Sequence, residues 1–120
     1  MELFAIFLGG GAGSLCRYGL AKAFPAGPEG FPYGTLAANF LACVVLGVAW
    51  HYFASHTGVN SQVKAMVLVG FCGGFSTFST FSFETLRLIQ AGNYGIAALY
   101  VIGSMVSCLL VLMIIGKWMK

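Results

Sequence analysis

Charged residues are scarce in this chain of 120 residues, making up 8% of it against 59% hydrophobic residues. A water-soluble domain carries about 25% charged residues, so this composition excludes a surface that faces water on all sides. Six Lys or Arg and three Asp or Glu leave a net charge of +3 that forms no patch, which excludes a nucleic-acid-binding protein. The composition predicts an integral membrane protein with a single domain over residues 1–120.

Signatures of metal sites and of catalysis are also missing. The four cysteines form no CxxC pair and lie in different apolar segments, so we expect small buried residues: Cys16, Cys43, Cys72 and Cys108. His51 and His56 lie at one segment end, where interfacial histidines are expected rather than metal or haem ligands. There is no nucleophile–base pair, and the chain is therefore not expected to be an enzyme.

Four stretches are apolar enough to cross a bilayer as helices, which needs about 20 residues each. We expect them at about 3–24, 33–53, 63–89 and 94–118, joined by short linkers rich in Pro, Gly or polar residues. The first stretch is too long, and lacks the basic start, of a cleaved signal peptide. The runs are too continuous for a β-barrel, which alternates apolar and polar residues. The expected fold is an all-α membrane protein with four transmembrane helices.

The positive charges favour neither orientation in the membrane. Four crossings divide them three against three: Lys64, Lys117 and Lys120 on the side of the termini, and Arg17, Lys22 and Arg87 on the other. Because Lys and Arg near segment ends set the orientation, this balance indicates dual topology, with an antiparallel homodimer as its natural product. The alternative is that charge counts in small proteins are noisy.

Four short helices leave little room for a pore inside one subunit, so a solute path is expected at a subunit interface. Gly9 and Gly13, and also Gly103 and Ser107, have the spacing of small residues that lets membrane helices pack closely. Glycine is common in membrane helices, so these pairs alone are weak evidence.

The third stretch carries polar residues in its middle. Gly73 and Gly74 are poor helix formers, and a break there would free backbone carbonyls that can coordinate a small cation. If a helix resumes after the break, Thr77, Thr80 and Glu84 share one face.

Phe78 and Phe81 lie on an adjacent face of the same helix. Phenyl ring edges are electropositive, so edges beside hydroxyl groups could attract a small anion without binding it too tightly. The alternative is that these rings face lipid or fill the core.

Further polar residues lie at depth in other stretches. Asn39 can donate or accept within the second, or hold two helices together. Tyr100, Ser104 and Ser107 form a hydroxyl stripe in the fourth, although serines there also bond locally to the preceding turn. Arg17 either extends to the membrane surface or concentrates anions in a vestibule.

Three ordered motifs resemble those of the Fluc/CrcB family of fluoride channels. Residues 9–18 (GGGAGSLCRY) are similar to the family's GGxxGAxxRY opening, with Ser14 in place of Ala. Residues 34–39 (GTLAAN) resemble its GTLxxN signature, and residues 73–81 (GGFSTFSTF) its GGxTTFSTF core, with Ser76 for the first Thr. The segment Ala42-Cys43-Val44 departs from the family's usual Gly-Ser-Phe, which puts in doubt a pore role for that stretch.

The resemblance implies a passive, fluoride-selective channel in the bacterial inner membrane that exports cytoplasmic fluoride and gives fluoride resistance. It implies a third helix broken near its middle and an antiparallel, dual-topology homodimer with two pores. A structural sodium ion would lie at the dimer centre, held by the backbone carbonyls of Gly73 and Ser76. No organic cofactor and no nucleic acid is expected; the partners are fluoride, a second copy and the lipid bilayer.

The resemblance also assigns residues to the pore. The fluoride path would be lined by Phe78, Phe81, Asn39, Ser79, Thr80, Tyr100 and Ser104. Arg17, Glu84, Thr77 and Ser107 would belong to a vestibule or polar track, and either Ser107 or Cys108 would complete the stripe on the fourth helix. The runner-up function is a small proton-coupled multidrug exporter, which needs a carboxylate deep in the membrane; only Glu84 qualifies.

Overall fold

The computed structural model describes residues 1–120 and contains helices but no strand. The helices are α1 (Glu2–Ala23), α2 (Tyr33–Ser55), α3 (Ser61–Lys64), the π-helical segment η1 (Ala65–Phe71), α4 (Cys72–Phe75), α5 (Phe78–Gln90) and α6 (Tyr94–Trp118). Four helical stretches, over 2–23, 33–55, 61–90 and 94–118, are long and apolar enough to cross a membrane. The expectation of an all-α protein with four membrane-spanning helices is confirmed.

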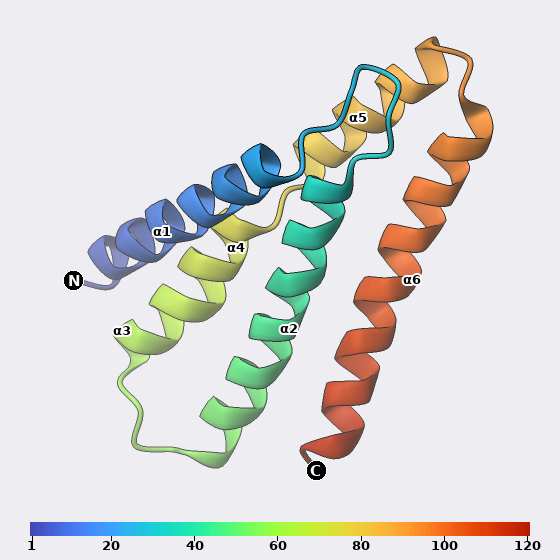
Figure 1. The fold of residues 1–120 in the computed structure, drawn as a ribbon. Coiled ribbons are helices and arrows are strands. Elements are labelled where there is room, and N and C mark those ends of the chain that lie inside the picture. The colour runs from blue at the N-terminus through green and yellow to red at the C-terminus, as the bar shows by residue number, and fades with distance from the viewer.

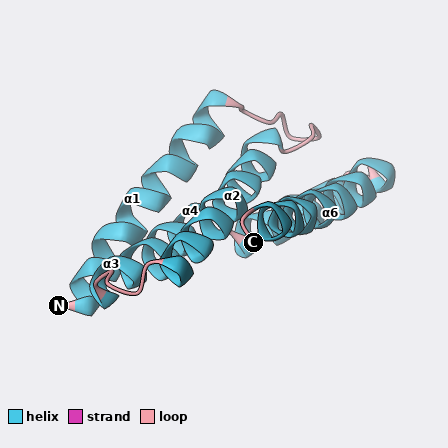
Figure 2. Cartoon of the chain, turned by 90° about the horizontal axis from the view of Figure 1, so that it is seen from below, coloured by secondary structure: helices cyan, strands magenta, loops and turns pink.

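The helices run side by side in a thin slab. Both termini and the 56–60 turn lie at one end, and the other two connections lie at the opposite end (Figure 1). Seen from below, α2 and α4 lie between α1 and α6 (Figure 2). The molecule measures 52 × 32 × 20 Å, so its smallest dimension is about two helix diameters. Only 16 of its 120 residues are buried, which leaves large apolar faces for lipid or another protein.

Glycines hold α1 against η1 and α4 at backbone contact. A Cβ atom on Gly9 would overlap the Met66 carbonyl oxygen, and one on Gly13 would overlap the Phe71 carbonyl oxygen. The prediction that Gly9 and Gly13 allow close packing is confirmed. Gly103 differs, because nothing lies within 4 Å of its Cβ position, so it makes no such contact within this chain.

Replacing Gly13 by alanine is expected to destabilise the fold by about 2 kcal/mol, because a backbone atom rather than a flexible side chain occupies the space. Gly11→Ala is the matched control, since nothing lies within 4 Å of its Cβ position on the same helix. The check is the SDS concentration at which helical circular dichroism is lost. Equal midpoints for the two variants would show that the α1 contact is not tight.

The helix that begins at Ser61 is interrupted between α4 and α5. Ser76 (φ −81°, ψ 157°) and Thr77 (φ −151°, ψ 123°) are both extended, and α5 restarts at Phe78. Thr77 caps the new helix: its hydroxyl oxygen accepts a hydrogen bond from the Thr80 amide at 3.2 Å. The chain therefore presents non-helical backbone at the middle of a membrane-spanning stretch.

Candidate functional site

Asn39 holds the extended junction between α4 and α5. Its Nδ2 atom donates to the Thr77 carbonyl oxygen at 3.2 Å, and its Oδ1 atom accepts from the Thr77 amide at 2.7 Å. This paired contact supplies to Thr77 the two hydrogen bonds that a neighbouring strand would otherwise provide. In a membrane, backbone without regular partners is tolerated only when protein satisfies it, and Asn39 does so from α2.

The interruption between α4 and α5 leaves two backbone carbonyls without their usual helical hydrogen bonds. The Thr77 amide donates to Asn39 and not to Gly73, and the Thr80 amide donates to the Thr77 hydroxyl and not to Ser76. The carbonyls of Gly73 and Ser76 therefore lack the donor four residues ahead that an uninterrupted helix would supply.

Arg17 reaches the end of α4 from α1. Its Nε atom donates to the Gly74 carbonyl oxygen at 3.1 Å. A positive side chain is stabilising at a helix C-terminus, where carbonyl dipoles point outward. This hydrogen bond holds the Arg17 side chain against the junction.

A groove of about 320 Å³ lies between α2, α5 and α6, beside the junction. It is lined by Asn39, Cys43, Ser76, Thr77, Phe78, Phe81, Ser104, Met105 and Cys108. None of these side chains carries a formal charge when the thiols are protonated. We refer to it below as the α2–α5–α6 groove.

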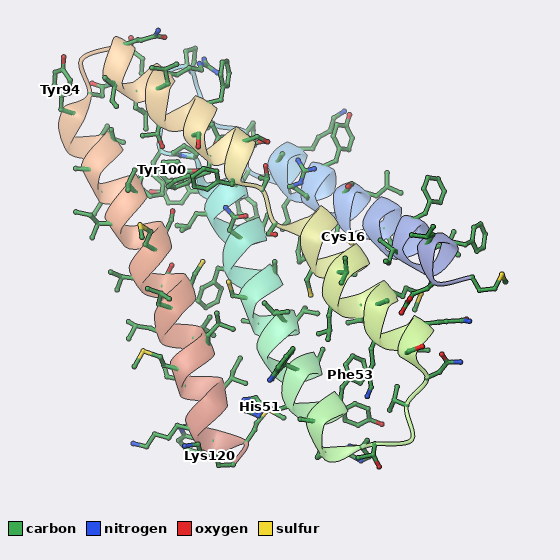
Figure 3. All side chains as sticks on the ribbon, turned by 180° about the vertical axis from the view of Figure 1, so that it is seen from behind. Cys16, His51, Phe53, Tyr94, Tyr100 and Lys120 are labelled. Carbon is green, nitrogen blue, oxygen red and sulfur yellow. The ribbon has the colours of Figure 1, made fainter.

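The aromatic rings of Phe78, Phe81 and Tyr100 lie in a row that begins at the groove. The ring centroids of Phe78 and Phe81 are 5.9 Å apart, and those of Phe81 and Tyr100 are 5.0 Å apart. Tyr100 extends from α6 toward α5 and the start of α2 (Figure 3) and is fully buried. Phe78, by contrast, lines the groove but is 79% exposed, so one wall of the groove is open in the single chain.

The serines of α6 separate into two environments. Ser104 is 5% exposed, lines the groove, and its hydroxyl has no hydrogen-bond partner. Ser107 donates to the Ser104 carbonyl oxygen at 3.2 Å and lines a different pocket, with Tyr33 and Phe40. Cys108, and not Ser107, therefore shares the groove with Ser104.

Glu84 of α5 forms hydrogen bonds with both α6 and α2. Its two carboxylate oxygens accept hydrogen bonds from Tyr100 at 2.8 Å and from Thr35 at 2.9 Å. Sequence reasoning gave no role to Thr35, although it lies within the GTLAAN motif. Glu84 and Thr35 also line a smaller cavity of about 130 Å³, together with Arg87 and parts of the 24–32 connection; we call it the mouth cavity.

The remaining hydroxyl residues of the core motif surround the cap of α5. The Thr77 hydroxyl donates to that of Thr80 at 3.1 Å, and it lies 3.4 Å from that of Ser79. Ser79 is exposed, and neither Ser79 nor Thr80 lines the groove. In the single chain these two residues thus lie beside the groove and not in its wall.

Comparison with known proteins gives a consistent result. The family model described as CrcB-like protein, Camphor Resistance (CrcB), matches residues 4–117. A protein of Phocaeicola vulgatus named fluoride-specific ion channel FluC is 44% identical over 120 residues, covering 99% of this chain and 98% of its own. Proteins of the same name from Escherichia fergusonii and Escherichia coli are 42% and 41% identical, over 83% and 82% of this chain and 79% and 78% of theirs.

Proposed function

The chain belongs to the CrcB family, and from this membership we propose that its fluoride path runs through the α2–α5–α6 groove and continues past Phe81, Tyr100 and Glu84 to the mouth cavity. The protein is a multi-pass membrane protein and a fluoride channel, not an enzyme. Fluoride that enters a cell as neutral HF ionises in the cytoplasm and cannot return through lipid. A passive pore lets the anion leave, and a negative interior helps by about 2.3 kcal/mol per 100 mV.

The unpartnered hydroxyl of Ser104 is the observation that carries this proposal. A buried hydroxyl without a hydrogen bond costs about 1–3 kcal/mol, so such groups normally have a partner. Ser104 lines the groove and can donate to an anion that occupies it. A site with one donor and no fixed charge binds a small anion weakly enough to release it.

The aromatic rings and α5 itself add to this electrostatic preference. The first backbone amides of α5 begin at Phe78, at the groove, and a helix N-terminus favours negative charge. Phe78 and Phe81 line the same space, and their ring edges are electropositive. Weak donors in a narrow passage replace the water of the smallest halide, and the narrowness excludes chloride.

The groove is open on one side, and this favours a second copy of the chain as the wall that closes it. Phe78 is 79% exposed in the single chain, and nothing lies within 4 Å of the Cβ position of Gly73. The balanced positive charges permit two orientations. We therefore propose an antiparallel homodimer in the bilayer, with two pores and with the interruption at Ser76 and Thr77 as a functional break in the third crossing.

The same junction suits a structural sodium ion between the two copies. The Gly73 and Ser76 carbonyls lack their helical donors, and carbonyl oxygens at broken membrane helices coordinate Na⁺. When bound, the ion would supply positive charge that holds two junctions together and raises the nearby potential.

Replacing Ser104 by alanine tests the proposed path. Loss of one donor to the anion, worth about 1.5 kcal/mol or more, is expected to slow fluoride efflux from liposomes about tenfold. Ser107→Ala is the matched control on the same helix, because Ser107 lines a different pocket and its hydroxyl already donates to the Ser104 carbonyl oxygen. A fluoride electrode records both rates, and equal slowing by the two substitutions would exclude the groove as the path.

A further inference from the structure

Three sulfur-containing side chains line the α2–α5–α6 groove. Cys43 on α2 and Cys108 and Met105 on α6 all line it. Helices α2 and α6 pack against each other, so Cys43 and Cys108 approach the groove from its two sides. Sulfur atoms are visible in the space between α2 and α6 (Figure 3). Cys16, in contrast, is exposed on α1, away from this space.

Two thiols and a thioether form a soft donor set. Soft sulfur ligands select monovalent copper over the hard cations that prefer oxygen. The charge also fits: if Cu⁺ displaces one thiol proton, one thiolate, one thiol and one thioether surround it with no net charge. Neutrality matters here because an uncompensated charge at membrane depth is costly. A divalent cation would need two thiolates to reach the same neutrality.

We propose that Cys43, Cys108 and Met105 form a binding site for one Cu⁺ ion per chain, in the wall of the α2–α5–α6 groove. Binding forms a copper–thiolate bond, breaks one S–H bond and releases one proton to the solvent; no electron is transferred. The site goes beyond fluoride conduction and does not depend on it. It uses side chains that sequence spacing did not pair, because Cys43 and Cys108 belong to different helices.

The test is competition for Cu⁺ between the purified full-length protein and the coloured copper complex of bicinchoninate, without oxygen. The wild type is expected to withdraw about one equivalent per chain. Cys43→Ser and Cys108→Ser each remove a ligand and should weaken retention about tenfold or more. Cys16→Ser is the matched control and should retain copper as the wild type does. Fluoride flux plays no part, so failure here leaves the proposed channel path untouched.

Two further results decide the interpretation. Met105→Leu keeps the side-chain volume and both thiols, so weaker retention by this variant supports the site even if a serine variant misfolds. Gel filtration shows which variants remain folded. The proposal is overturned if Cys16→Ser loses as much copper as Cys43→Ser, or if a folded Cys43→Ser, Cys108→Ser double variant retains one equivalent.

Discussion

Replacing Phe78 and Phe81 together by isoleucine is expected to slow fluoride efflux from liposomes about a hundredfold. Each ring edge is taken to contribute about 1.5 kcal/mol to the dehydrated anion, at the upper end of aromatic edge interactions. Losing both raises the barrier by about 3 kcal/mol, which is two powers of ten in rate. Isoleucine keeps the groove apolar and filled, but its aliphatic hydrogens carry no comparable positive edge.

Phe83→Ile is the matched control for this experiment. Phe83 belongs to the same helix, is 60% exposed and does not line the groove. Its replacement should leave fluoride efflux within about twofold of the wild type, since single exposed apolar residues contribute little. If the double variant conducts as fast as Phe83→Ile, the aromatic edges are not part of the conduction path.

Replacing Asn39 by alanine is expected to abolish measurable efflux. The substitution removes both hydrogen bonds to Thr77 and leaves an amide and a carbonyl unpaired inside the membrane. At about 1–3 kcal/mol for each unsatisfied group, the extended junction would lose several kcal/mol. The groove, whose wall includes Ser76 and Thr77, would then no longer form.

Asn60→Ala provides the comparison for Asn39→Ala. The Asn60 side chain also accepts from a backbone amide, that of Gln62 at 2.8 Å, but it does so in an exposed turn. Water replaces that partner, so efflux should hardly change. Fluoride-electrode traces at equal protein density measure both variants, and normal conduction by Asn39→Ala would show that the junction does not depend on this amide.

The helical spans could be predicted from the sequence because lipid demands continuous apolar runs. Gly9 and Gly13 were predictable for a similar reason, since only small residues allow backbone contact between membrane helices. Gly103 has the same spacing to Ser107 but faces open space, because spacing does not determine which side of a helix meets a neighbour.

The hydrogen-bond partners were not predictable, because each pair joins residues that are far apart in the sequence. Asn39 was expected either to line the anion path or to hold two helices together; both ends of its amide bond to Thr77, 38 residues away, and it also lines the groove. Glu84 was placed on a face with Thr77 and Thr80, yet its partners are Thr35 and Tyr100. Local periodicity predicts which residues share one face of a helix. Which residues of other helices contact that face depends on how the helices pack.

The segment Ala42-Cys43-Val44 shows how a local departure from a family pattern is accommodated. Ala42 is 3% exposed and packs with Ala38 and Phe75, so a small residue is required there. Cys43, one position along, lines the groove instead. The departure therefore places a thiol in the wall of the proposed path, while Ala42 packs against Phe75 of α4.

Passive selectivity for fluoride is tested most directly by comparing fluoride and chloride efflux from liposomes that contain the wild-type protein and a potassium ionophore. With equal pH on both sides, the proposed path predicts rapid fluoride release once potassium can move, while chloride stays inside. Release of both halides at similar rates, or fluoride release only when a proton gradient is imposed, would contradict it.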